Sequence, residues 1–518
     1  MQKTLRDSAA LRWLVLILIS SLLFSTYWFY DFYGGIKGLM EREMGISSEE
    51  YGRIMSSTTF ANVIGMIILG GIILDRWGIR LAGLVFGGLS FLGAIISAAA
   101  VAGWFGDDKS TMLIWSITGR VLFGIGMEVV CVMVTRTIVK WFMGYEMALA
   151  MALNIGFGRL GTAMGMAVAP DLAAGGSISP AFSFAAILIG ISLVFFIIYI
   201  FFDLKIDKQR SESGIVTEGE VDEEKFRFAD FRKLITNRSF IYIALLCMVF
   251  YSAVFPLLAY APDLLVNKYG FSYEMGSQGE FAMFGSAVLG TAFIFVLLLI
   301  FGLSFSMIPR SLKKNGHKLL SFMVISVLFL GYVYILRDVF SEWLVNGPKT
   351  ASLIPMGTIL FTPIFGSIVD KRGKAATLMM IGSALLVFAY LSLSVFNHVY
   401  LGYLGLISLG IAFSLVPAAM WPAVARIVAE NRLGTAYGTM FTLQNWGLAA
   451  FFWGIGALLD FVNRHRLSDI EAETAAYDYT IPVLMLALLG VISAWLAYKL
   501  KQADKLQGYG LENPGITQ

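Results

Sequence analysis

The chain has 518 residues, of which 58% are hydrophobic and only 14% are charged. An ordinary soluble domain carries about 25% charged residues, so this composition indicates an integral membrane protein. The formal net charge of +3 is small, and the lysines and arginines lie between apolar runs, which argues against nucleic acid as a partner. Cys131 and Cys247 lie far apart inside apolar runs, so neither a disulfide framework nor a metal site is predicted.

Fourteen apolar runs are long enough to cross a bilayer, for which a helix needs roughly 20 residues. The first run has no small-residue cleavage site after a short core, so we expect a first span and not a removed signal peptide. An even number of spans predicts that both chain ends lie on one side of the membrane. The predicted spans are 12–33, 53–74, 80–103, 111–135, 147–169, 181–202, 240–262, 281–307, 319–336, 350–369, 375–396, 399–424, 435–459 and 479–498.

Lysine and arginine concentrate in alternate loops, and this bias predicts which side of the membrane is cytoplasmic. The basic side receives the N-terminal segment, the loops that begin near Arg76 and Arg136, the linker 203–239 and the C-terminal tail. We therefore expect both termini in the cytoplasm. The opposite loops are poorer in positive charge, with exceptions at Arg464 and Arg466.

The only long charged segment contains EGEVDEEKFRFADFRK and separates six predicted spans from eight. Its FRFADFRKL end is either a short amphipathic helix on the membrane surface or a plain solvated linker. The predicted parts are an N-terminal six-helix bundle (1–202), a cytoplasmic linker (203–239), the first span of the C-terminal bundle with its external loop (240–280), an inserted transmembrane hairpin (281–337), the remainder of the C-terminal bundle (338–500) and a cytoplasmic tail (501–518).

Two predicted cytoplasmic loops carry the same pattern, GGIILDRWGIRLAG after the second span and FGSIVDKRGKAATL after the tenth. The shared spacing of glycine, aspartate and basic residues indicates internal duplication. A short turn uses glycine for backbone freedom, and a carboxylate at the membrane edge needs a cation or a helix N-terminus. The matching residues are Gly71, Asp75, Arg76, Gly78 and Arg80 in the first loop and Gly366, Asp370, Arg372, Gly373 and Lys374 in the second.

These paired loops, together with GRVLFGIG in the fourth span, resemble the major facilitator superfamily over nearly the whole chain. The resemblance implies an all-α membrane fold of two six-helix bundles, with the extra pair of spans as an inserted hairpin that we expect to be peripheral. In that family the loop aspartate and its basic neighbours lock the cytoplasmic side while the carrier faces outward. The resemblance assigns this gating role to Asp75, Arg76, Arg80, Asp370 and Arg372, and a structural or gating role to Arg120.

Residues 154–161 read NIGFGRLG and contain the G-x-G-x-x-G spacing of dinucleotide-binding loops. That fingerprint needs a strand before it and a helix after it, whereas this segment lies inside an apolar run of membrane-span length. We therefore predict no cofactor site here. The three glycines, Gly156, Gly158 and Gly161, are expected to let neighbouring helices pack closely around Arg159.

Glu128 and Arg159 predict a binding site within the membrane. A charge at mid-bilayer costs about 2.5 to 3.5 kcal/mol unless it is paired or wetted by a cavity. Both residues lie at middle depth, roughly 12 and 20 Å from the cytoplasmic ends of their spans. An arginine suits the carboxylate of a zwitterionic solute, and Glu128 suits the ammonium. The alternative is that the two side chains bond each other as a structural contact.

Four segments resemble the branch of the superfamily that contains the animal lysosomal dipeptide carrier. Carriers of that branch move dipeptides by facilitated diffusion and hold the peptide's two ends with a fourth-span glutamate and a fifth-span arginine, which correspond to Glu128 and Arg159. The segments are FYDFYGGIKGLMEREMGIS, KWF with NIGFGRLGT, FYSAVFPLLAYAPDLLVNKYGFS and RLGTAYGTMFTLQNWGLA.

Five more residues are candidates to line the site, although packing is the alternative for the aromatic ones. Asp31 either faces the site or caps the external loop. These candidates are Tyr30, Asp31, Tyr251, Asn445 and Trp446.

The sequence predicts a secondary transporter that moves small zwitterionic solutes, most specifically dipeptides, by alternating access, with proton coupling through Glu128 left open. The alternatives are a carrier of small organic or inorganic anions and a non-transporting membrane sensor. No nucleophile or metal motif supports an enzyme, and no cofactor or accessory subunit is predicted. The expected partners are a small-molecule substrate and the lipid bilayer. We expect a plasma membrane or bacterial inner membrane, because no acidic dileucine signal is seen near the N-terminus.

Overall fold

The computed structural model describes residues 5–173, 175–212, 234–275, 287–312, 314–429 and 432–514, and these residues fold almost entirely into helices. The first half comprises η1 (Leu5–Asp7), α1 (Ala9–Gly35), α2 (Lys37–Met44), α3 (Ser48–Ser57), α4 (Phe60–Val63), α5 (Met66–Val101), α6 (Lys109–Phe142), α7 (Met147–Ala173) and α8 (Ser179–Glu212). The second half comprises α10 (Arg238–Tyr269), α11 (Ala287–Ser311), α12 (Asn315–Ile335), α13 (Arg337–Leu344), α14 (Gly347–Arg372), α15 (Ala375–Ser394), α16 (Val399–Ile427), α17 (Leu433–Asn463), α18 (Leu467–Glu471) and α19 (Thr480–Gln507).

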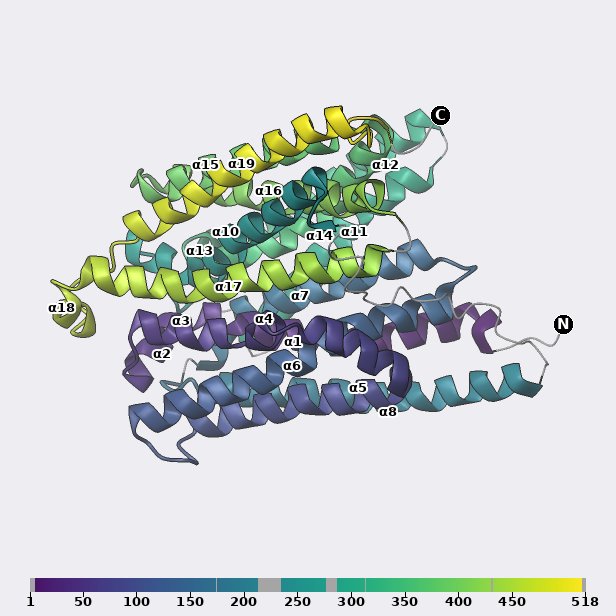
Figure 1. The fold of residues 1–518 in the computed structure, drawn as a ribbon. Helices are drawn as coiled ribbons and strands as arrows, with labels where there is room; N and C mark the ends of the chain where they lie inside the picture. The colour runs from purple at the N-terminus through teal and green to yellow at the C-terminus, as the bar shows by residue number, and fades with distance from the viewer. Residues whose placement is uncertain are drawn as a thin grey trace.

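The helices form two bundles that lie side by side with their axes roughly parallel (Figure 1). In the first bundle α1 packs on α7 and α8, and α5 packs on α6 and α8. In the second bundle α10 packs on α17 and α19, and α15 packs on α16 and α19. Both ends of the chain lie at one end of this assembly, which we call the terminal end. The opposite end, where α2 and α18 lie, is called the distal end.

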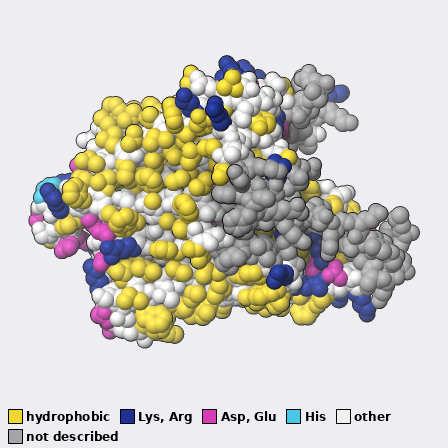
Figure 2. Space-filling model, in the orientation of Figure 1, with side chains coloured by type: hydrophobic (Ala, Val, Ile, Leu, Met, Phe, Trp, Pro, Cys, Tyr) yellow, Lys and Arg dark blue, Asp and Glu magenta, His cyan; other side chains and the backbone are white. Residues whose placement is uncertain are grey.

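Twelve helices in the described part of the chain are long and apolar enough to cross a membrane. Apolar side chains cover a broad band of the face shown in Figure 2, and charged side chains gather toward its two ends. This distribution is expected where lipid surrounds the middle of a helical bundle. The prediction of an all-α integral membrane protein is therefore confirmed.

The segment predicted as the second span is not one continuous helix. Residues 48–77 form α3, α4 and the beginning of α5, and Gly65 turns the chain at φ +86° between α4 and α5. The run SSTT explains the break, because hydroxyl groups that bond to nearby carbonyls compete with helix hydrogen bonds. Ser57 donates to the carbonyl of Ile54, and Thr59 donates to that of Ser56.

Polar caps at several helix starts agree with signals in the sequence. Ser47 and Glu50 form a capping box at α3, and Asp108 accepts from the backbone of Thr111 at α6. Asn237 and Asn346 cap α10 and α14 in the same manner. These caps satisfy backbone N–H groups that have no partner within the helix.

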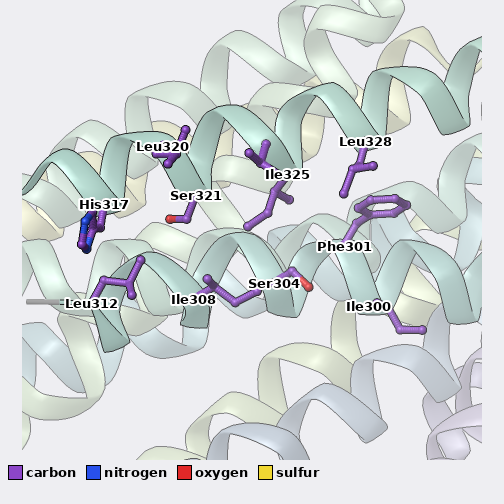
Figure 3. A pocket seen from close by; sticks show the side chains of 11 residues that line it. Ile300, Phe301, Ser304, Ile308, Leu312, His317, Leu320, Ser321, Ile325 and Leu328 are labelled. Carbon is purple, nitrogen blue, oxygen red and sulfur yellow. The ribbon is translucent and has the colours of Figure 1, made fainter.

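Helices α11 and α12 lie between α10 and α14 along the chain and pack against each other. Only 6% of the most apolar stretch of α12 is buried. Figure 3 shows a groove between the two helices, lined mainly by apolar side chains such as Phe301, Ile308 and Leu328, with His317 at one end. Helix α11 is less peripheral than we expected, because it contacts both α7 of the first half and α14 of the second. Thr291 on α11 also donates to Asp171 on α7.

The two halves meet through polar contacts toward the distal end. Lys37 of α2 lies 2.8 Å from Asp263 of α10, and Lys349 of α14 lies 2.7 Å from Asp171 of α7. Tyr51 of α3 donates to the carbonyl of Ala259 on α10. The halves are therefore joined at the distal end in this conformation.

The first repeated loop kinks at glycine as predicted. Gly78 has φ +71° and ψ 170°, which separates two helical stretches within α5. The Arg80 side chain pairs with Asp203 at 2.7 Å and with Asp207, both on α8 of the same half. Gly71 lies in α5 and Arg76 is exposed, whereas the side chain of Asp75 is outside the described part of the structure.

The second repeated loop also turns at glycine, because Gly373 has φ +67°. Gly366 lies in α14, and the side chains of Asp370 and Arg372 are exposed. A Cβ at Gly373 would lie 2.3 Å from the backbone of Asn513, so the C-terminal segment packs directly on this loop. The gating role of the two loops is not tested by this conformation.

The glycines of the G-x-G-x-x-G segment lie in α7 and differ in their surroundings. A Cβ at Gly161 would lie 2.2 Å from the carbonyl oxygen of Phe24 on α1, whereas one at Gly158 would make ordinary contact with Tyr27. A Cβ at Gly156 would meet nothing within 4 Å. Close helix packing therefore depends on Gly161.

We predict that Gly161→Ala destabilises the protein by about 1 to 3 kcal/mol, because the added methyl group overpacks the contact between α1 and α7. Gly156→Ala is the matched control and should be neutral or stabilising, since alanine favours the helix by up to about 1 kcal/mol. Thermal unfolding of the purified proteins in detergent measures the difference. Equal unfolding midpoints for the two variants would contradict the packing argument.

Candidate functional site

Glu128 lies near the middle of α6 and is partly buried. The side chain of Asn62, on the short helix α4, lies beside its carboxyl group. Asn62 is fully buried, and its amide atoms have no well-formed hydrogen bond to any described residue. Tyr27 and Tyr30 of α1 and Cys131 of α6 also lie close enough to interact electrostatically with Glu128. The break in the second span therefore brings an amide group next to the predicted site.

Arg159 lies near the middle of α7 and is also partly buried. Its guanidinium carbon lies 4.4 Å from the ring centre of Phe413 on α16, so the first half presents this cation to an aromatic ring of the second half. A ring face attracts a cation without neutralising its charge. Tyr27 lies close enough to interact electrostatically with both Arg159 and Glu128.

The side chains of Glu128 and Arg159, which are both within the described chain, form no ion pair with each other. The alternative in which the two charges simply bond each other is therefore not what this conformation shows. Helices α6 and α7 are in contact, so the carboxylate and the guanidinium lie on neighbouring helices. Neither charge is therefore neutralised by the other in this conformation.

Asp31 is buried on α1 and accepts a hydrogen bond of 2.6 Å from the hydroxyl group of Thr162 on α7. Thr162 is three residues after Arg159, which places both on one side of α7. Asp31 therefore faces the interior of the first bundle, and it does not cap the external loop. Arg159 and Arg120 both lie close enough to act on its charge.

Arg120 is fully buried in the first bundle. Its guanidinium donates to the backbone carbonyls of Phe29 and Tyr30, each at 3.2 Å, and lies 4.2 Å from the ring centre of Tyr33. The Tyr30 ring centre lies 5.5 Å from the same guanidinium. These contacts tie α6 to α1, and they fit the structural role expected of Arg120 better than direct contact with a solute.

The candidates from the second half are dispersed. Tyr251 is buried on α10, accepts a hydrogen bond of 3.0 Å from the indole N–H of Trp421 and stacks on Phe255. Asn445 is buried and donates to the carbonyl of Phe441 within α17. Trp446 is half exposed and donates to the carbonyl of Val63 at the end of α4. The side chains of Asn445 and Trp446 therefore lie in different surroundings, although the two residues are adjacent in sequence.

The two buried lysine–aspartate pairs that join the halves were not predicted from the sequence. The sequence feature that could have indicated these pairs is the repeated tetrapeptide APDL, which occurs at 169–172 and again at 261–264. In both copies the aspartate reaches a lysine of the other half, Asp171 to Lys349 and Asp263 to Lys37. Phe413 and Asn62 were also missed, because neither has a sequence pattern that distinguishes it from ordinary packing.

Two helical bundles joined at one end, with unpaired opposite charges at mid-depth, define a membrane transporter of the secondary carrier class. The sequence model of the Major Facilitator Superfamily matches residues 19–354, and the chain belongs to this family. It is a multi-pass membrane transporter and not an enzyme.

The chain is similar to the lysosomal dipeptide transporter MFSD1 of Danio rerio, with 25% identity over 495 residues that cover 94% of this chain and 87% of that protein. It is 24% identical to the Homo sapiens protein of the same name over 459 residues, which cover 87% and 80% of the two chains. Its fold is similar to that of the nucleoside transporter NupG, with a TM-score of 0.57 and 15% identity over 94% of this chain and 99% of that one.

Cys131 offers a native reporter of this site, because it is partly exposed beside Glu128 and Tyr27, whereas Cys247 is fully buried. We predict that a small water-soluble maleimide labels Cys131 several times faster than Cys247 in the native protein, because reaction needs access to the thiol. Mass spectrometry of labelled wild type, Cys131→Ala and Cys247→Ala measures the two rates. Equal rates, or faster labelling of Cys247, would contradict the placement of Cys131 at an accessible site.

Proposed function

We propose that this protein carries small zwitterionic solutes, and specifically dipeptides, across the membrane by alternating access. The observation that carries the proposal is the pair Glu128 and Arg159, opposite charges at mid-depth that do not neutralise each other. Arg159 would hold the peptide carboxylate as a bidentate pair, and Glu128 would accept hydrogen bonds from the ammonium. The names of the similar animal transporters support the same substrate class.

A carrier of small anions is the second candidate, and the burial of Arg120 argues against it. An anion site would use several arginines without needing a carboxylate. Arg120 is fully buried against carbonyls of α1, so it adds no positive charge to an accessible surface. The carboxylate of Glu128 would repel an anion near Arg159. Both facts favour a solute that carries both charges.

We further propose that all fourteen predicted segments cross the membrane. Helix α7 and residues 48–75 are not among the twelve helices, although α5 from Arg76 to Val101 is. Arg159 and the glycines lower the hydropathy of α7, and the polar run at 56–62 interrupts the second segment. Together with α11 and α12 as an inserted hairpin, this arrangement puts the terminal end and both termini in the cytoplasm. The conformation is then closed on the outer side.

The two repeated loops would act in the opposite conformation. They lie at the terminal end, where Asp370 and Arg372 are exposed and Arg80 is paired within its own half. Closure of the terminal end would bring the loops against the other half and engage these charges. Such an exchange of contacts is what alternating access requires of a carrier built from two bundles.

We predict that Glu128→Gln and Arg159→Lys each reduce saturable dipeptide uptake into proteoliposomes by about 10- to 100-fold. A lost hydrogen bond to a charged group costs about 1.5 to 3 kcal/mol, which corresponds to this range. Exposed positions at the distal end provide matched controls, and Glu471→Gln and Arg464→Lys should transport normally. Imposing a proton gradient on the same vesicles separates facilitated diffusion from proton coupling.

The two ends of the substrate test the assignment of each residue. Acetylation of the peptide amine should weaken transport by wild type but should have little further effect in Glu128→Gln. Amidation of the peptide carboxylate should weaken transport by wild type but should have little further effect in Arg159→Lys. If folded wild type transports small anions and no dipeptide, the zwitterion proposal is wrong and the anion carrier is favoured.

Single cysteines test the proposed topology in a background that carries Cys131→Ala and Cys247→Ala. We predict that an impermeant thiol reagent labels Ser468→Cys in intact cells and labels Lys314→Cys and Gln502→Cys only after permeabilisation. All three positions are exposed. Labelling of Lys314→Cys in intact cells would contradict a hairpin that crosses the membrane.

We propose the plasma membrane or a bacterial inner membrane as the location of this chain. The similar animal proteins are lysosomal by name, so the lysosomal membrane is the alternative. Fractionation of the source cells and detection of the protein in each membrane distinguishes the two.

A further inference from the structure

A buried charge cluster lies at the distal end, away from Glu128 and Arg159. Lys37 of α2 is fully buried, and its ammonium lies 2.7 Å from Glu41 and 2.8 Å from Asp263. Three aromatic rings also surround this ammonium, with ring centres 5.8, 5.6 and 4.9 Å away, and they belong to Tyr51, Tyr260 and Tyr477. The cluster joins α2 of the first half to α10 and the segment before α19 of the second half.

The charges in this cluster do not balance when all three groups are ionised. One ammonium and two carboxylates leave a net charge of −1 in a buried site, where like charges raise each other's affinity for a proton. Binding of one proton makes the cluster neutral. The surroundings of Glu41 and Asp263 indicate which of the two carboxylates binds the proton.

Asp263 is the carboxylate that stays ionised. It accepts hydrogen bonds from Lys37 at 2.8 Å and from the hydroxyl of Tyr273 at 2.7 Å, and it also accepts from the hydroxyl of Tyr479. Three donors stabilise the charged form of a carboxyl group. Only 2% of its side chain is exposed, so a proton from solvent has little access to it.

Glu41 has weaker support and a path to solvent. It interacts with Lys37 and accepts a hydrogen bond of 2.5 Å from the hydroxyl of Ser48, and 12% of its side chain is exposed at the distal end. Burial raises the pKa of Glu41 to about 7, although the nearby charge of Lys37 acts in the opposite direction. Asp263 raises this pKa further.

We propose that Glu41 is a proton-binding site coupled to closure of the distal end. The closed conformation holds the proton on Glu41, and separation of the halves releases it. This inference rests on the alternating access proposed above, but it does not depend on which solute is carried.

The direction of the pH effect follows from the two conformations. When the halves separate, Glu41 leaves Asp263 and is exposed to water, so its pKa falls toward the ordinary value of 4.5. The closed state therefore binds the proton more tightly, and acid on the distal side favours closure. Between pH 7 and pH 4.5 the closed-to-open ratio should increase up to about tenfold for each unit by which the pH falls.

Other charged and titratable groups face this cluster from α2, α3, α10, α17 and the segment before α19. Asp460 of α17 accepts from the backbone N–H groups of Ser48 and Glu49. A lysine paired with two carboxylates and buried tyrosines keep their protonation states near neutral pH. The groups other than Asp460 are Lys37 of α2, Tyr51 of α3, Tyr260 and Asp263 of α10, Tyr273 after α10, and Tyr477 and Tyr479 before α19.

Pulsed electron paramagnetic resonance tests the proposal without any substrate. Spin labels on Ser110→Cys in the first half and Ser468→Cys in the second, with both native cysteines replaced by alanine, report the distance across the distal end. The population with the shorter distance should increase as the pH falls from 8 to 4.5. Glu41→Gln should remove this dependence and hold the short distance throughout, because the glutamine is neutral at every pH.

Two variants on or near the same position serve as controls. Glu43→Gln changes an exposed carboxyl of α2 that bonds to residues 177 and 178 of its own half, so it should keep the full pH dependence. Glu41→Asp retains a carboxyl group and should also keep a pH-dependent distance. An unchanged pH dependence in Glu41→Gln would overturn the proton site while leaving alternating access intact. A single distance at every pH in wild type would overturn the coupling of protonation to closure, whereas alternating access is tested separately by dipeptide uptake.

Discussion

The structure depends on how buried charges are held where its two halves meet. Lys37 with Asp263 and Lys349 with Asp171 are nearly inaccessible to solvent, and each pair has one partner in each half. Removing one partner of such a pair leaves an uncompensated buried charge, which costs about 3 to 5 kcal/mol. A buried ion pair is stable while both partners are in contact. The two charges can separate only if water enters to solvate them as the halves move apart. These properties suit an interface that has to open and close.

The middle of the bundle uses charge in a different manner. Arg159 rests on the ring of Phe413, Asp31 is bonded to Thr162, and Glu128 lies beside Asn62. These neighbours support each charged group without neutralising it. Buried charges are thus paired across the halves at the distal end and are held by polar or aromatic neighbours in the centre.

Helices α11 and α12 are connected to the interface between the halves. Helix α12 faces outward along an apolar groove, but α11 contacts both halves and supplies Thr291 to Asp171, the carboxylate that also binds Lys349. The hairpin is consequently coupled to the interface through one aspartate. The position of α11 in the sequence does not suggest this contact with Asp171.

The sequence alone determined the all-α membrane class, the family and the positions of most helices, because apolar runs of span length and a repeated loop are local patterns. It also indicated Gly78 and Gly373 as turns, since a short connection between helices favours a residue that tolerates positive φ. Glu128 and Arg159 were recognisable as unusual charges within spans, although their partners were not. Only the tertiary structure decided that these two do not pair, that Asp31 faces inward, that Arg120 braces α1 and that Lys37 and Lys349 join the halves. The physical reason is that a charge in a span must find support from another helix, and which helix lies opposite is fixed by the packing of segments far apart in the chain.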